Sequence, residues 1–203
     1  MNENRKEQII LATLELAAQH GLSGVSMSMI ADKTGIKKPS LYNHFASKDE
    51  LVEETYRFLR ERAKAAAHIQ PVAYEKMFDG KTASEVLTEA TFGYISVVDN
   101  EQINKFYKVV YSERCFSRIA AKILIEETEK MIFATKQLFY AMQGRGLLKF
   151  ADVEASAVTF AMCVHAAMDF RADCLVAGVL LDNADKMLRD VVRSVCEQNA
   201  VLA

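Results

Sequence analysis

The spacing of Ala31, Gly35 and Leu41 is the feature that most constrains how the first fifty residues can fold. The small side chain lets two helices approach, the glycine permits a left-handed turn between them, and the leucine fixes the second helix inward. Ile36 fills the angle. This is the packing requirement of a helix-turn-helix, whose second helix is presented to the DNA major groove. A small helical bundle with an incidental glycine turn would show the same spacing, so the neighbouring sequence has to decide.

Helix signals lie on both sides of this turn. Residues 5–20 place apolar side chains at helical spacing, and Gly21 is expected to end that helix. Ser26 stands at the N-cap of a second helix with the sequence MSMIADKT. A third helix is expected from about Lys38 to Phe45, with Pro39 in its first turn, where the missing N–H costs nothing. Three helices therefore fit inside 45 residues.

The rest of the chain continues the helical pattern. The capping box Ser47-Lys48-Asp49-Glu50 predicts a fourth helix to about Ile69, long and lightly apolar like a connector between two bodies. Residues 70–81 are expected to form a loop, with one turn at YEKMF. A second capping box, Thr82-Ala83-Ser84-Glu85, opens a helix to about Val98. Further helices are expected at about 101–112, 117–142, 152–177 and 184–199. Two prolines, eight glycines and the lack of strand-like alternation predict an all-α fold.

Composition narrows the class of protein. Four cysteines lie far apart, at positions 115, 163, 174 and 196, without C-x-x-C spacing, so we predict neither a disulfide framework nor a metal or cofactor. No charged start leads into an apolar segment and no run of about 18 apolar residues occurs, so we expect a cytoplasmic protein without a membrane span. The net charge of −2 conceals an asymmetry, because residues 1–48 carry six basic and four acidic side chains.

The turn belongs to a longer set of residues that runs from about Lys6 through Leu51. The set consists of Gly21, Ser26, Ile30-Ala31, Gly35-Ile36, Ser40-Leu41-Tyr42, His44-Phe45, Lys48 and Leu51. It resembles the DNA-binding domain of TetR-type transcriptional repressors. The resemblance implies a fold of about nine helices, a homodimer, a palindromic operator and a C-terminal domain that binds a small effector. We therefore expect a helix-turn-helix domain at residues 1–48, a connecting helix at 49–69 and a helical effector-binding and dimerisation domain at 70–203.

Phosphate contacts are expected from four side chains of this region. The phenol of Tyr42 and the imidazole of His44 can donate to backbone phosphates, which fixes the register on DNA without reading sequence. Lys48, at the start of the fourth helix, adds its charge to the positive end of that helix dipole. Ser26 can offer its hydroxyl to a further phosphate besides capping its helix.

Base reading is expected from the start of the third helix. Lysine can donate to guanine, asparagine can pair with adenine, and a proline ring can touch a thymine methyl. The residues in position to do this are Lys37, Lys38, Pro39, Ser40 and Asn43. Leu41 and Phe45 are expected in the core. Lys37 stands where many members of the family have a Ser or Thr cap, and Ser28 stands where some use Arg, so the start of the third helix and the operator sequence depart from the family pattern.

The sequence of the C-terminal part predicts a helical architecture but identifies no specific chemistry. Aromatic and methionine side chains recur at helical spacing, and most are expected in the core. In the family the effector lies among helices four to eight, and the candidates for its lining are Phe106, Tyr107, Val110, Phe133, Gln137 and His165. The family pairs its last two helices with those of a second copy, so we expect a homodimer there. The small residues suited to close packing are Ala155, Ala161, Ala166 and Ala167.

His165 and Asp169 are one helical turn apart and allow three interpretations: anchoring a polar ligand, binding a metal with a third group, or lying satisfied in a dimer interface.

The sequence as a whole allows three hypotheses about function. The first is a sequence-specific DNA-binding regulator, a repressor released from a palindromic operator by a small effector. The second is an enzyme that uses His165 with Asp169 or Cys163, although no set of nucleophile, base and orienting group is legible. The third is a helical dimer that acts through protein partners, which leaves the polar third helix unexplained. We predict the first, and no enzymatic activity.

Overall fold

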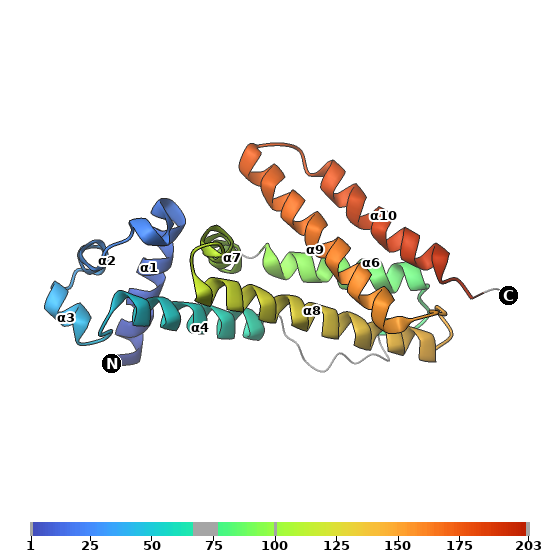
Figure 1. Cartoon of the computed structure of the whole chain (residues 1–203), viewed down its shortest axis with the longest axis horizontal. Coiled ribbons are helices and arrows are strands. Elements are labelled where there is room, and N and C mark those ends of the chain that lie inside the picture. The colour runs from blue at the N-terminus through green and yellow to red at the C-terminus, as the bar shows by residue number, and fades with distance from the viewer. Residues whose placement is uncertain (1, 67–76, 100, 202–203) are drawn as a thin grey trace. The chain divides into compact units, whose positions relative to one another are not determined.

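The computed structural model describes residues 2–66, 77–99 and 101–201. Within these ranges every regular element is an α-helix, and there are nine of them (Figure 1). They are α1 (Asn2–Gly24), α2 (Met27–Thr34), α3 (Lys38–Tyr42), α4 (Lys48–Ala66), α6 (Ala83–Val98), α7 (Glu101–Glu113), α8 (Arg118–Gly144), α9 (Val153–Ala177) and α10 (Asp182–Gln198). The all-α prediction is confirmed. The expected end of the fourth helix near Ile69 and most of the 70–81 loop lie outside the described residues.

The chain divides into two compact units. The first unit comprises residues 1–69 and 97–126, and the second comprises residues 70–96 and 127–203. Each unit has its own apolar core. The division into a DNA-binding domain, a connecting helix and an effector domain is a statement about function, and it stays a prediction.

The core of the first unit explains why its short helices form. Ile9 of α1, Ile30 of α2 and Leu41 of α3 are each completely buried, and Phe45 and Leu51 close the same cluster. A helix of five to eight residues is marginal alone in water, so packing against α1 and α4 is what stabilises α2 and α3. The residues that the turn spacing singled out therefore do lie at the contact between the helices.

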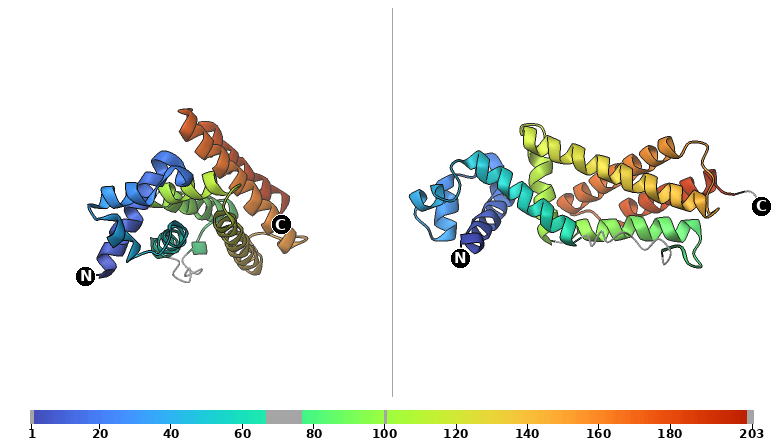
Figure 2. Two further views of the ribbon diagram at one scale, coloured as in Figure 1. Left: turned by 60° about the vertical axis from the view of Figure 1, so that its left-hand side comes forward. Right: turned by 90° about the horizontal axis from the view of Figure 1, so that it is seen from below.

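The core of the second unit is built around two stacked rings. The centroids of Phe139 in α8 and Phe150 in the following loop lie 4.5 Å apart with nearly parallel planes, and Phe160 of α9 packs on Phe139. Leu188 of α10 is completely buried in the same cluster. α9 and α10 run side by side in opposite directions (Figure 2). They are joined through Gly178, whose φ of 68° lets α9 end in a left-handed turn.

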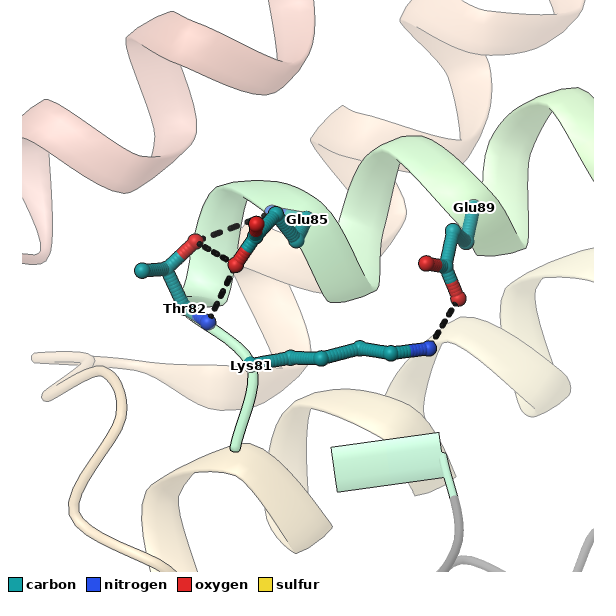
Figure 3. A network of polar contacts seen from close by, with 4 residues as sticks. All are labelled: Lys81, Thr82, Glu85 and Glu89. Carbon is teal, nitrogen blue, oxygen red and sulfur yellow. Dashed lines mark hydrogen bonds and ion pairs between the residues drawn. The ribbon is translucent and has the colours of Figure 1, made fainter. Parts of the chain in front are cut away.

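Both predicted capping boxes are present. At the start of α6 the Thr82 hydroxyl accepts from the Glu85 amide at 3.3 Å, and the Glu85 carboxylate accepts from the Thr82 amide at 2.8 Å (Figure 3). The Glu85 carboxylate also accepts from the Thr82 hydroxyl at 2.7 Å. The two bonds to the carboxylate, the one from the backbone amide first, hold the pKa of Glu85 below its usual value. At the start of α4 the Glu50 amide donates to the Ser47 hydroxyl at 3.0 Å. There the Glu50 carboxylate accepts from the amide of Ala46, one residue earlier than a standard box provides.

One expected helix end needs correction. α3 ends at Tyr42 instead of Phe45, because the Leu41 carbonyl accepts from the His44 amide, three residues on, as well as from the Phe45 amide, and a tighter turn follows the helix. Gly21 ends the first helical run as expected, and the helical assignment of α1 resumes after it for one turn, to Gly24. A real break occurs within it, since Gly21 has a φ of 69° and a ψ of 154°. Residues 22–24 are therefore a separate final turn.

Candidate nucleic-acid interface

The turn between α2 and α3 has the geometry that its sequence predicts. The Ser26 hydroxyl accepts from the Met29 amide at 3.2 Å and caps α2. At the other end Gly35 has a φ of 65°, and its amide donates to Asp32. The amide of Ile36 reaches back to the Ala31 carbonyl at 3.0 Å. These bonds satisfy the last carbonyls of α2 and set the direction in which α3 leaves.

α3 separates its apolar and polar side chains sharply. Leu41 is completely buried and Phe45, just past its end, is 1% exposed, whereas Tyr42 is 44% exposed. The five predicted base-reading residues are exposed as well, namely Lys37, Lys38, Pro39, Ser40 and Asn43. Lys37 occupies the N-cap without a side-chain hydrogen bond, as its residue type predicts. The helix thus presents a polar face to solvent and is held from behind.

The positions of Asn43 and His44 differ from the expectation. Both were expected within the third helix, with His44 on one face with Tyr42. Asn43 is instead the C-cap of α3 and His44 follows it, half-buried, in the tight turn. Whether His44 contacts a phosphate stays a prediction.

Lys48 has a partner that sequence reasoning missed. Its ammonium donates to the Leu22 carbonyl at 2.7 Å, which ties the start of α4 to the final turn of α1. Because an ammonium has three donors, two remain for a phosphate. Leu22 lies 26 positions away, so no local spacing could have indicated this bond.

Lys6 is a second feature that the sequence did not reveal. Its ammonium lies 5.5 Å from the centroid of the Phe45 ring, so α1 contributes an exposed positive charge beside the end of α3. The two residues are 39 positions apart, and only the folding of the first unit brings them together.

The charges of the first unit are distributed unevenly. Two basic side chains of this unit are neutralised by ion pairs, Lys33 of α2 with Glu15 at 2.8 Å and Arg62 of α4 with Glu7 at 3.1 Å. Within the part of the chain that the structure describes, Lys37 and Lys38 have no acidic partner. Uncompensated positive charge therefore gathers at the start of α3, where an anionic ligand would be attracted.

The six predicted effector-lining residues fall in both units. Phe106 and Val110 of α7 belong to the core of the first unit. Tyr107 is half-buried beside them, and the centroids of its ring and the Phe106 ring lie 5.4 Å apart. The other three belong to the second unit, where Phe133 is 63% exposed, Gln137 is exposed and His165 is half-buried. Their role in ligand binding stays a prediction.

His165 and Asp169 are both half-buried on α9. Across the described ranges, no group of three or more His, Cys, Asp or Glu side chains is arranged to hold a metal ion. Cys163 is a free, exposed thiol.

A tight glycine turn, a buried anchor and an exposed polar helix with unpaired lysines define the chain as a helix-turn-helix DNA-binding protein. Residues 9–55 match the family described as bacterial regulatory proteins, tetR family. The chain therefore contains a tetR-family DNA-binding domain over these residues.

Individual relatives match this chain over different lengths of its sequence. The HTH-type transcriptional regulator PksA of Bacillus subtilis is 22% identical over 204 residues, which cover 98% of this chain and 93% of that protein. The HTH-type transcriptional repressor KstR2 of Mycobacterium tuberculosis is 44% identical over 57 residues, 28% of each chain. The crystal structure of a TetR transcription regulator from Haloarcula marismortui has a TM-score of 0.71 at 14% identity, covering 97% of this chain and 98% of that one. This last likeness concerns the fold.

Proposed function

We propose that the protein is a homodimeric repressor that binds a palindromic operator through α3 and leaves it when a small effector binds. The observation that carries the proposal is the contrast along α3, where buried Leu41 alternates with exposed Pro39, Ser40 and Tyr42. A purely structural helix of five residues would gain nothing from an uncompensated pair of lysines at its start. The tetR-family match over residues 9–55 supports the same assignment.

Contacts with DNA would divide by type. Lys37, Lys38 and Asn43 have the donors and acceptors that distinguish base edges in the major groove. Tyr42, Lys48 and Ser26 would position the domain on phosphates, which carry no sequence information. Lys6, from α1, would add a further charge near the same strand. Affinity should fall steeply with salt because each phosphate contact releases counterions.

The dimer would form through α9 and α10. α9 is long and apolar enough to cross a membrane by length and composition, yet only 33% of its most apolar stretch is buried inside the chain. Its exposed apolar side chains include Val158, Met162 and Phe170, and α10 adds Met187. A second copy would cover this face without requiring a membrane, as in an isologous interface.

The alanines expected at this interface separate into two groups. Ala161 and Ala167 are buried in the core of their own chain, at 1% and 2% exposed, so they are not available to a second copy. Ala155 and Ala166 are exposed and remain suited to it. Two-fold symmetry would place the two copies of α3 about one turn of B-DNA apart, roughly 34 Å.

An effector would act by favouring one arrangement of the helices over another. Thermodynamic reciprocity requires DNA to weaken effector binding by the same factor, with a coupling of about 1–3 kcal/mol. α7 is our choice for part of the lining, because Phe106, Tyr107 and Tyr111 form a continuous aromatic row on it. A regulator of chromosomal genes would work in the cytoplasm.

Selection of duplexes from a random-sequence library by the full-length protein tests the function. We expect a palindromic consensus and binding by a dimer in analytical ultracentrifugation. Failure to enrich any sequence, together with weak binding that is unaffected by changing Lys37 and Lys38 to Ala, would refute sequence-specific DNA binding. Expression of a reporter from the selected sequence then separates repression from activation.

A further inference from the structure

Leu22 lies where three helices of the first unit meet, and both of its backbone polar groups are taken by side chains from other helices. Its amide donates to the Glu113 carboxylate of α7 at 3.0 Å. Its carbonyl accepts from the Lys48 ammonium at the start of α4 at 2.7 Å, and also from the Val25 amide at 3.2 Å. The side chain of Leu22 is itself buried. α7 and α4 are therefore joined through one residue of α1.

The Gly21 break creates the free amide. With a φ of 69° and a ψ of 154°, Gly21 interrupts the helical hydrogen bonds, so the amide of Leu22 needs a partner from elsewhere. A carboxylate gives a charge-assisted bond, stronger than a neutral acceptor would give. The break and its acceptor lie 91 positions apart in sequence.

Glu113 is an unusual choice for its position in α7. It is the last residue of that helix, where a negative charge opposes the helix dipole. The stability of α7 alone would favour a neutral or basic residue there. The unfavourable placement is explained by the bond to Leu22, which only an acceptor can make.

Buried Tyr56 of α4 adds a second group beside the same carboxylate. Its ring packs edge-on against Phe106 of α7, with centroids 6.0 Å apart. Within the described residues its hydroxyl has no hydrogen-bond partner. Burial, and secondarily the charge of Glu113, raises the pKa of Tyr56 to about 12. An unpaired buried hydroxyl is costly, so the contact of α4 with α7 is less stable than a fully hydrogen-bonded one.

We infer that Glu113 is a positioning residue for DNA binding, acting through Leu22 on Lys48. In the arrangement described, Glu113 holds the final turn of α1 and that turn holds the ammonium of Lys48 at the DNA-facing start of α4. A movement of α7 that breaks the bond between Glu113 and Leu22 releases this turn and with it Lys48. This inference rests on the proposed function, because it takes Lys48 as a phosphate contact.

A double-mutant cycle on the full-length protein tests the inference. Glu113→Ala and Glu113→Gln are made in the parent and in a Lys48→Ala background, and dissociation constants are measured on the duplex that the parent protein selects. In the parent background we expect Glu113→Ala to weaken binding about five- to tenfold, and Glu113→Gln, which keeps an acceptor, about twofold. In the Lys48→Ala background both changes should have almost no effect. Ser112→Ala is the matched control, since that exposed hydroxyl bonds only to its own helix.

Hydrogen exchange at the Leu22 amide provides a readout independent of DNA. We expect it to be protected in the parent protein and to exchange at least tenfold faster after Glu113→Ala, with the amide of Val25 less affected. Equal loss of DNA affinity in both backgrounds, or a Gln variant as weak as the Ala variant, would overturn the inference. If Glu113→Ala does not fold, the Gln variant and the protection of Leu22 in the parent still decide it. A parent protein that selects no duplex would overturn the proposed function instead, and would leave the exchange result intact.

Discussion

Replacing Gly35 by Ala isolates the conformational requirement of the turn. Gly35 has a φ of 65°, and a Cβ added there would meet no atom within 4 Å, so no clash contributes. The left-handed conformation costs a residue with a Cβ about 1–2 kcal/mol. The lower entropy of the unfolded alanine chain offsets part of that cost, because Ala gains about 0.4–1 kcal/mol over Gly through this effect. We therefore expect Gly35→Ala to lower the free energy of unfolding by about 1 kcal/mol.

Gly24→Ala is the matched control in the same unit. Gly24 does not have a positive φ, and its added Cβ would lie 3.5 Å from the Cβ of His20, an ordinary contact. Its replacement should leave stability unchanged or raise it by a few tenths of a kcal/mol. Gly35→Asn should fall between the parent and Gly35→Ala, because asparagine tolerates the left-handed region.

Urea unfolding followed by far-UV circular dichroism measures these differences from the transition midpoint and slope. The expected 1 kcal/mol corresponds to about 2–4 °C in melting temperature for a chain of this size. A Gly35→Ala variant as stable as the parent would refute the reasoning, because no steric term is available to compensate. A Gly24→Ala variant that loses as much would also refute it, since the loss would then not depend on φ.

Three further outcomes are expected. Tyr42→Phe should weaken binding by a similar factor on every duplex, whereas Lys38→Ala should change the preference among duplexes, and competition binding on a set of single-base variants distinguishes the two. Met162→Glu places a charge on the exposed face of α9 and should convert the dimer to a monomer in analytical ultracentrifugation, with the helix content unchanged. The pKa of Glu85 is lowered, so its ionised form stabilises the start of α6 at neutral pH, and that contribution is lost as the pH falls through the lowered pKa. A carboxyl NMR titration should show this low pKa of Glu85. In the Thr82→Val variant, where only the bond from the backbone amide remains, the pKa of Glu85 should rise part of the way to its usual value. An unchanged pKa in that variant would contradict the assigned cause.

Local chemistry made much of the fold predictable. Ser26, Gly35 and the box from Thr82 to Glu85 act on backbone groups three to five positions away, so their effect is contained in a short stretch of sequence. The end of α3 was less predictable. Phe45 is apolar and correctly assigned to the core, but its burial does not require it to lie within the helix. The amides of His44 and Phe45 share the Leu41 carbonyl, so a tight turn replaces a further helical turn.

Other features could not be read from the sequence because they join distant positions. The bonds of Leu22 to Lys48 and Glu113 depend on how α1 packs against α4 and α7. The exposed face of α9 was equally hidden. That helix is apolar nearly all round, so periodicity does not distinguish Ala161, which is buried, from Ala166, which is exposed.

The length of α3 limits how much sequence one copy of the protein can recognise. Five helical residues rise about 7.5 Å, which spans about two base-pair steps of DNA. In the proposed mode of DNA binding, one copy would inspect only about three base pairs directly through α3, a pattern that recurs by chance about once every 64 positions. Two copies at a fixed spacing would inspect about six base pairs, a pattern that recurs by chance about once every 4,000 positions. Because a genome offers roughly 10⁶ or more competing sites, such a pattern would occur there many times. Selectivity in the cell must then also depend on base pairs that α3 does not touch, through the shape and flexibility of the DNA between and around the half-sites.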